Sequence, residues 1–193
     1  MALPRRGELP LPHHAPAAND GSDGPARDLY SVIRGPAATR GDPPVFNFFA
    51  PLHIDNREIG VTADHVHPLV ASGRGFSQWW AEDVVEDKST GIVALGFFKR
   101  ATVYRCRPIR FVHPKQADWS VESGKEWEHT KLLFELTPNG GRTLLRFTHA
   151  NWRAETDYFV ACTTTWGELM FRLKAAAEGK APGPLFSADG MAY

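Results

Sequence analysis

Cysteine is scarce in this 193-residue chain, which has only Cys106 and Cys162, far apart and without a partner at Cys-x-x-Cys spacing. Neither a disulfide framework nor a thiolate metal site is suggested by two isolated cysteines. His65 and His67 are the closest histidine pair in the ordered part of the sequence, but side chains two positions apart on a helix point about 200° apart and cannot share an ion. We therefore expect reduced thiols, no metal and no cofactor.

Long apolar runs and an excess of one charge are also lacking. No stretch approaches the roughly 18 apolar residues of a membrane-spanning helix, and the N-terminal MALPRRGELPLPHHAP has no apolar centre typical of a secretory signal. Twenty-two Lys and Arg residues balance twenty-two Asp and Glu residues, without a run of like charge. This balance disfavours a nucleic acid or an anionic lipid surface as partner. We expect a cytoplasmic protein that binds no nucleic acid and does not insert into membranes.

The composition divides the chain into tails and one domain. Residues 1–44 hold eight of the fifteen prolines, five glycines and a single aromatic residue, Tyr30. So little apolar surface does not offset the entropy of ordering the segment, and we expect a mobile N-terminal tail. From residue 45, apolar runs alternate with turns. We therefore place one domain at 45–180 and a C-terminal tail at 181–193.

Short elements open the domain. We expect a first strand over residues 52–61 and a short helix over 62–70 with Thr62 as its N-cap. The glycines of Ser72-Gly73-Arg74-Gly75 predict a chain break, followed by one or two helical turns over 76–80.

Strand signals then follow one another with no long helix between them, which is typical of an antiparallel sheet rather than of alternating β-α units. The expected strands span residues 91–99, 102–112, 117–122, 129–136 and 142–149. The last two flank Pro138-Asn139-Gly140-Gly141, in which Asn139 and Gly140 supply the two positive-φ positions of a tight type I′ turn. The strand at 91–99 is apolar on both faces, so the side that looks inward stays open.

Alternation along this hairpin predicts which side chains point inward, because successive side chains of a strand face opposite sides of a sheet. One face of the first strand carries Thr130, Leu132, Phe134 and Leu136. One face of the returning strand carries Thr143, Leu145, Phe147 and His149. We therefore expect His149 to point into the interior beside Phe147.

One long helix closes the domain over residues 155–178, with Gly179 as its stop and Pro182 just beyond. Five residues at helical spacing form an apolar stripe: Phe159, Cys162, Trp166, Leu169 and Leu173. At 1.5 Å per residue the helix would be about 35 Å long, enough to cross a sheet. Two short helices, a curved antiparallel sheet and this helix predict an α+β fold.

These features together resemble the SRPBCC (START-like, helix-grip) superfamily, particularly the branch similar to the C-terminal domain of the heat-shock-protein-90 ATPase activator. The resemblance covers about residues 54–178. It rests on EIGVTADHVHPLV followed by FSQWW, on a strand ending in Trp119, on LLFELTPNGGRTLLRFTH, and on TTWGELMFRL. It implies a helix-grip fold, in which the sheet wraps around the long helix and leaves a hydrophobic cavity that opens near the short helices.

The resemblance places an aromatic pair, Trp79 and Trp80, at the mouth of that cavity. Adjacent helical positions differ by about 100°, so one ring can pack into the core while the other borders the opening. The expected ligand-binding residues are Trp79, Trp80, Trp119, Phe134, Phe147, His149 and Trp166. The alternative is that these rings only fill a core that needs volume, since aromatic stripes are usually core.

No motif supplies a nucleophile with a base, a carboxylate pair or a phosphate cradle. The turn at residues 138–141 lacks the GxGxxG spacing of a dinucleotide-binding loop. The candidate catalytic residues are therefore His149, inward-facing at the end of a strand, and Tyr158 as a neighbour. The alternative for a lone buried histidine is a satisfied hydrogen-bonding role.

Three functions stay open. The favoured one is a carrier or sensor of a small apolar molecule, which needs only a cavity with a few polar groups. The second is a lyase or polyketide cyclase-type enzyme that uses the same cavity. The third is an ATPase-activating chaperone partner acting through its surface, which we disfavour because the resemblance covers one domain of a two-domain activator. A homodimer also stays open.

Overall fold

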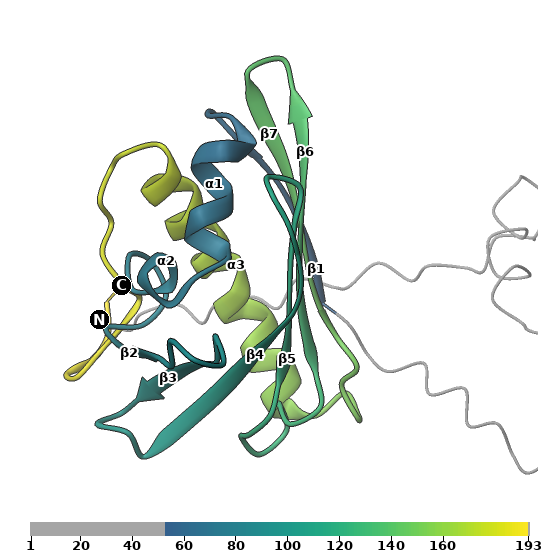
Figure 1. Ribbon diagram of the computed structural model, residues 1–193. Helices are drawn as coiled ribbons and strands as arrows, with labels where there is room; N and C mark the ends of the chain where they lie inside the picture. Colours follow the sequence, from purple (N-terminus) through teal and green to yellow (C-terminus); the bar gives the residue numbers. More distant parts are fainter. Residues whose placement is uncertain (1–52, 193) are drawn as a thin grey trace, which may run out of the picture. The chain divides into compact units, whose positions relative to one another are not determined.

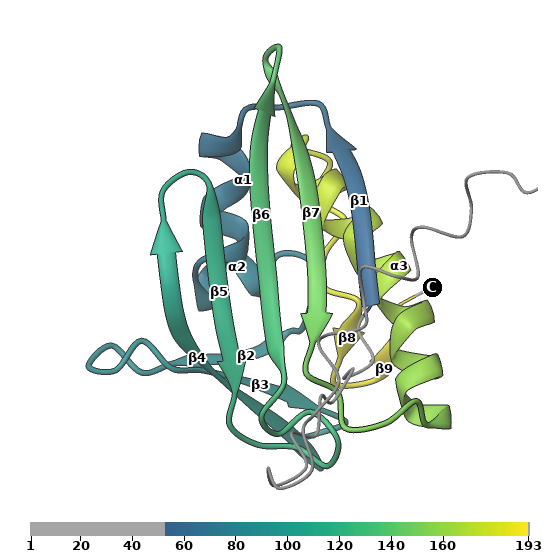
Figure 2. The ribbon, with the colours of Figure 1, turned by 90° about the vertical axis from the view of Figure 1, so that its right-hand side faces the viewer.

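The computed structural model describes residues 53–192. Its main feature is a curved antiparallel sheet (Figures 1 and 2). Its strand order is β1-β7-β6-β5-β4-β3-β2. The strands are β1 (His53–Ile59), β2 (Asp83–Glu86), β3 (Val93–Phe97), β4 (Thr102–Val112), β5 (Gln116–Val121), β6 (Lys131–Asn139) and β7 (Arg142–Ala150). Every neighbouring pair is antiparallel, as predicted. The predicted N-terminal tail and the first residue of the predicted first strand lie outside the described residues.

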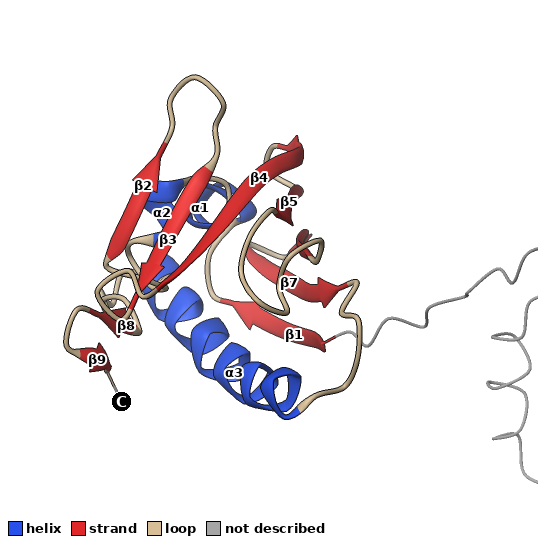
Figure 3. Ribbon diagram, turned by 90° about the horizontal axis from the view of Figure 1, so that it is seen from below, coloured by secondary structure: helices blue, strands red, loops and turns tan. Residues whose placement is uncertain are grey.

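The long helix α3 (Asp157–Ala177) closes the open side of the curved sheet (Figure 3). It begins where the Thr156 hydroxyl accepts a hydrogen bond from the Phe159 amide, and it ends before Gly179, which has a φ of 75°. Its buried residues are Cys162, Trp166, Leu169, Met170 and Leu173. The predicted stripe is thus confirmed, although Phe159 is only half-buried at its end. None of the helices in residues 53–192 is long and apolar enough to cross a membrane.

The β6–β7 hairpin has the predicted inward face. All eight residues expected to point inward are buried, and Phe134 lies opposite Phe147 in the register. The turn is shifted by one residue from the prediction. Asn139 still pairs with Arg142, so the positive φ angles fall on Gly140 and Gly141, at 56° and 82°. A two-residue loop of two glycines satisfies the same backbone requirement as the predicted Asn-Gly pair.

The two short helices lie after β1, as predicted, but the second one begins earlier. Helix α1 (Ala63–Val70) continues through Pro68, and α2 (Gly73–Phe76) occupies the predicted chain break. The Ser72 hydroxyl caps α2 by accepting a hydrogen bond from the Gly75 amide at 3.0 Å. A Cβ at Gly75 would lie 2.3 Å from the Pro68 carbonyl oxygen, so this glycine allows close packing of α2 on α1 rather than a break.

Thr62 occupies the N-cap position of α1 without capping it through its side chain. Its hydroxyl instead forms a hydrogen bond with the His65 Nδ1 at 3.0 Å. The sequence left open which side of β3 faces the interior. The structure answers this, because Val93, Leu95 and Phe97 are all buried on the inward face.

Residues beyond α3 form a small hairpin, β8 (Phe186–Ser187) and β9 (Gly190–Met191), where the sequence predicted a tail. The Leu185 amide donates to the Trp79 carbonyl at 3.2 Å, and the Phe186 amide donates to the Trp80 carbonyl at 3.0 Å. Leu185 is fully buried. The hairpin is therefore joined to the turn that carries the two tryptophans.

Candidate functional site

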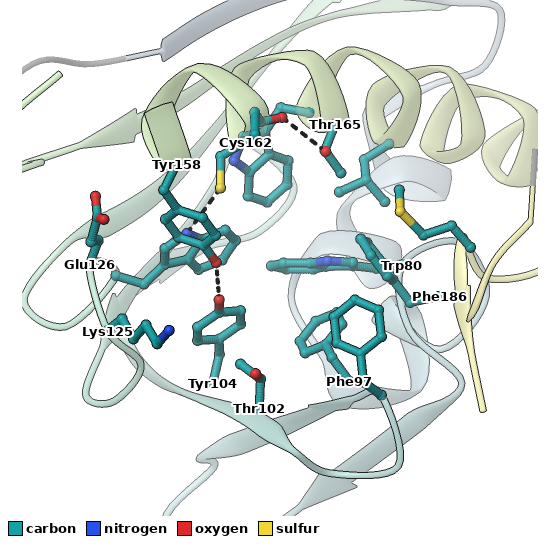
Figure 4. Close-up of a pocket in the computed structure, with 16 residues that line it drawn as sticks. Trp80, Phe97, Thr102, Tyr104, Lys125, Glu126, Tyr158, Cys162, Thr165 and Phe186 are labelled. Atoms are coloured by element: carbon teal, nitrogen blue, oxygen red, sulfur yellow. Dashed lines mark hydrogen bonds between the residues drawn. The ribbon is translucent and has the colours of Figure 1, made fainter. Parts of the chain in front are cut away.

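A cavity of about 490 Å³ lies between α3, the β3–β4 hairpin, the loop after β5 and the C-terminal hairpin (Figure 4). Its apolar end is lined by Trp80, Phe97, Leu169, Phe186 and Met191. They come from the sheet, from α3, from the C-terminal hairpin and from the turn after α2, and the aromatic rings meet edge to face. The Phe97 and Phe186 ring centroids are 4.9 Å apart at 88°, and those of Trp80 and Trp166 are 4.9 Å apart at 60°. This end offers aromatic surface on several sides to an apolar group.

The other end of the cavity is polar. The hydroxyls of Tyr104 and Tyr158 are hydrogen-bonded to each other across it (Figure 4). The Tyr104 ring stacks on Trp127 at 4.3 Å, and the Trp127 Nε1 donates to the Cys162 Sγ at 3.4 Å. Burial raises the pKa of Tyr104, of Tyr158 and of the Cys162 thiol. All three groups therefore keep their protons at neutral pH.

Two charged residues, Lys125 and Glu126, lie in the β5–β6 loop beside the tyrosines. The Glu126 carboxylate accepts a hydrogen bond from the Thr156 hydroxyl at the start of α3. Lys125 is exposed, and within residues 53–192 its ammonium group forms no hydrogen bond or ion pair with another side chain. Figure 4 shows the ammonium group turned toward the Tyr104 end of the cavity and the Glu126 carboxylate turned away from it.

His149 is fully buried and does not line the cavity. The Trp166 Nε1 donates to its Nδ1 at 3.0 Å, so that nitrogen carries no proton, and the Nε2 donates to the Thr130 hydroxyl at 2.9 Å. The Thr130 hydroxyl in turn donates to the Trp127 carbonyl at 2.6 Å. Both ring nitrogens are thus engaged in a chain of hydrogen bonds that runs from Trp166 through Thr130 to the Trp127 carbonyl. This arrangement matches the satisfied structural role weighed from the sequence rather than the acid-base role.

Three of the predicted site residues line the cavity, namely Trp80, Tyr158 and Trp166. The others are buried in the adjoining core: Trp79, Trp119, Phe134, Phe147 and His149. Of the aromatic pair, Trp79 lies in the core and Trp80 lines the cavity. The Trp79 Nε1 donates to the Leu69 carbonyl at 3.0 Å, so this indole satisfies a carbonyl in the last turn of α1.

Several lining residues were missed by the sequence reasoning. Tyr104 could have been found, because it shares a strand face with the buried Cys106, two positions on. Trp127 lies in a loop and Phe186 lies in the segment predicted as a tail, and neither position has a periodic pattern that indicates burial.

No protein-family model matches the chain, and no curated protein matches it. Solved structures do match. The structure of the Aha1 dimer from Colwellia psychrerythraea is 21% identical, with a TM-score of 0.58, and the match covers 67% of this chain and 98% of that one. Protein MLL2253 from Mesorhizobium loti is 13% identical, with a TM-score of 0.57 and the same coverage, 67% and 98%.

CalU16 from Micromonospora echinospora is 20% identical, with a TM-score of 0.53, and the match covers 67% of each chain. At these identities the likeness concerns the fold. It confirms the helix-grip fold that the resemblance to the SRPBCC superfamily implied.

Proposed function

We propose that this chain binds a small, largely apolar molecule in the cavity between its sheet and α3, as a carrier or sensor. The observation that carries the proposal is the aromatic-lined hollow of about 490 Å³. Small-molecule sites are concave, mostly apolar, and roughly 300–1,000 Å³ in volume. Protein interiors otherwise hold few voids larger than a water molecule, so a hollow of this size favours a ligand over imperfect packing.

A cyclase or lyase in the same cavity has weaker support. His149 lacks a free nitrogen for proton transfer, and the raised pKa of Tyr158 makes it a poor base at neutral pH. An ATPase-activating role rests only on a fold shared with Aha1, and one fold serves many functions. A binding protein needs neither a base nor a partner, so it requires the fewest features beyond those described.

Native mass spectrometry of freshly purified protein tests the proposal. We expect a bound small molecule, or, after its removal, a thermal shift with a panel of apolar ligands. At one hundred times the dissociation constant a ligand stabilises the folded state by about 2.7 kcal/mol, a rise of roughly 5–10 °C for a domain of this size. The same spectra report oligomeric state, and a homodimer would be compatible with the dimeric Aha1 neighbour.

A matched pair on α3 locates the binding. Thr165 lines the cavity, whereas Thr164, one residue away, is exposed on another side of the helix. Thr165→Trp should fill the cavity and abolish the ligand-induced shift, and Thr164→Trp should keep it. If Thr165→Trp bound every ligand as the unmodified chain does, the cavity would not be the site.

A further inference from the structure

The two ends of the cavity differ in chemistry, and the difference bears on the kind of ligand. Trp80, Phe97 and Phe186 surround one end with aromatic carbon, while Tyr104, Tyr158 and Lys125 meet at the other (Figure 4). A wholly apolar molecule would form no hydrogen bond with the second group, in which the tyrosine hydroxyls bond each other and Lys125 is exposed to solvent. A ligand with a polar end can add hydrogen bonds to these groups, and hydrogen bonds to a charged group are the stronger ones.

The tyrosine pair presents a hydrogen-bond donor. Each phenol has one hydroxyl hydrogen, so when Tyr158 donates to Tyr104, the Tyr104 hydroxyl keeps a hydrogen to donate to a ligand. In the opposite arrangement the Tyr158 hydrogen can also go to the Cys162 sulfur, with which Tyr158 forms a side-chain hydrogen bond. Burial raises the pKa of both groups, which therefore remain protonated donors. A ligand atom bound at this end would therefore accept a hydrogen bond from the tyrosine pair.

Lys125 supplies one positive charge without a counter-ion from the described residues. The adjacent Glu126 is engaged elsewhere, since its carboxylate accepts from Thr156 at the N-terminal end of α3, where the helix dipole favours negative charge. The salt bridges found in residues 53–192 do not include Lys125. This end of the cavity therefore combines one cation with one hydroxyl donor.

We propose that the ligand is an amphipathic monocarboxylate, with its carboxylate on Lys125 and the tyrosine hydroxyls and its apolar body along Trp80, Phe97 and Phe186. The inference rests on the proposed binding function and assigns its ligand class. A single negative charge matches the single ammonium group. A phosphate monoester would bring about 1.5 to 2 negative charges close to Glu126, and one lysine would not balance them.

The cavity volume limits the size of this ligand. At about 30 Å³ for each water-sized group, 490 Å³ holds roughly sixteen non-hydrogen atoms. Decanoate lies within that limit and carries one carboxylate on an unbranched apolar chain. Decanol has the same apolar chain and no charge, which makes it the matched neutral probe.

Calorimetric titration of the full chain with decanoate and with decanol tests the inference. We expect decanoate to bind about tenfold more tightly, the lower end of what a hydrogen bond to a charged group contributes, because Lys125 is exposed. Lys125→Met should remove that advantage and leave decanol affinity unchanged. Lys115→Met removes the same charge from an exposed position away from the cavity and should have no effect.

The outcomes distinguish a wrong ligand class from the absence of ligand binding in the cavity. If decanol bound as tightly as decanoate, with both lost in Thr165→Trp, the cavity would be a binding site and the carboxylate assignment would be overturned. Tighter, Lys125-dependent binding of decyl phosphate would also overturn it. If neither decanoate nor decanol, nor any ligand of the apolar panel, showed binding that Thr165→Trp abolishes, the proposed function would fall as well.

Discussion

At the scale of single residues, His149 shows how a polar group is held in an aromatic core. It lies between Trp127 and Trp152, at 4.6 and 4.5 Å between ring centroids, and its hydrogen bonds run to Trp166 and Thr130. A buried polar group without a partner would destabilise the fold, so each of these bonds matters to stability. The His149 imidazole, which belongs to β7, thereby connects α3 to the β5–β6 loop that carries Thr130.

His149→Ala should destabilise the chain by about 2–5 kcal/mol, because it leaves the Trp166 indole N–H without an acceptor, removes the donor to the Thr130 hydroxyl and opens a void. Urea denaturation followed by tryptophan fluorescence measures the loss. Arg146→Ala, on the exposed face of the same strand, is the control and should change stability by less than about 1 kcal/mol. Equal stability of the two variants would contradict a structural role for His149.

At the scale of elements, close contact between α1 and α2 positions the two tryptophans. Gly75 lies against the backbone of Pro68 and Leu69, and the chain then turns through residues 77–80. The Trp119 Nε1 donates to the Val70 carbonyl at 2.9 Å, so the end of α1 is also joined to β5. A displaced α2 would therefore move Trp80 at the cavity.

Gly75→Ala should cost about 1–3 kcal/mol or more, because the new Cβ would overlap backbone atoms that cannot move aside independently. Gly167→Ala is the matched control in α3, where a Cβ meets nothing within 4 Å. It should be neutral or stabilise the helix by up to about 1 kcal/mol. Thermal unfolding of both variants tests the pair, and a harmless Gly75→Ala would disprove the close packing.

The C-terminal end of α3 is joined to the β1–α1 connection through Glu178. Its carboxylate accepts from the Lys174 ammonium, from the Gly60 amide at 2.8 Å and from Lys180 at 3.1 Å. The hydrogen bond from Lys174, followed by that from Gly60, lowers the pKa of Glu178 from 4.5 to about 2.

This shift predicts a pH-dependent contribution. Because the pKa of Glu178 is lower in the folded than in the unfolded chain, its stabilisation is complete above about pH 4.5 and is lost as the pH falls toward 2. Glu178→Gln should lower stability at pH 7 by no more than about 1 kcal/mol, because Lys174 and Lys180 are partly solvent-exposed. The difference should fade between pH 4.5 and 2 in denaturation curves.

Glu155→Gln, at an exposed position before α3, is the control for that experiment and should show no such fading difference. A Glu178→Gln variant that differed from the unmodified chain equally at pH 7 and at pH 2.5 would contradict the assignment.

At the scale of the whole molecule, the cavity is enclosed by parts that are distant in the sequence. Phe97 from the sheet, Trp166 from α3 and Phe186 from the C-terminal hairpin all face it. The hairpin is attached through the buried Leu185, through the backbone of residues 79–82, and through Arg172 of α3, which donates to the Ala192 carbonyl. One wall of the proposed binding site therefore depends on a short segment after the last helix.

Deletion of residues 184–193 should weaken ligand binding tenfold or more and lower the melting temperature. It removes Phe186 and Met191 from the cavity, exposes the surroundings of Leu185, and leaves the carbonyls of Trp79 and Trp80 without their donors. Burial of a leucine side chain alone contributes about 1.5–3 kcal/mol. Binding and melting measurements on Asp189→Ala, in the exposed β8–β9 turn, should match those of the unmodified chain. Retention of full affinity by the shortened chain would show that the hairpin is not a wall of the site.

The sequence predicted the elements well wherever a period was present. Strand alternation placed His149 and Phe147 inward, and helical spacing identified the buried face of α3. Prediction was less reliable where glycine was the only signal. Gly75 permits close packing between α1 and α2, where a chain break was predicted. The positive-φ turn positions are Gly140 and Gly141, where Asn139 and Gly140 were predicted.

The sequence by itself determined the α+β class, the order of the long strands and helices, and their inward faces, because these follow from the backbone periods of 2.0 and 3.6 residues. The short strands β2, β8 and β9 were not predicted, since they are too short to show a period. The tertiary structure alone decided which inward residues border empty space. Trp79 and Trp80 have the same side chain and adjacent positions, yet one satisfies a carbonyl of α1 and the other faces the cavity with Phe186. A cavity forms where separate elements fail to meet, and no local pattern along the chain carries that information.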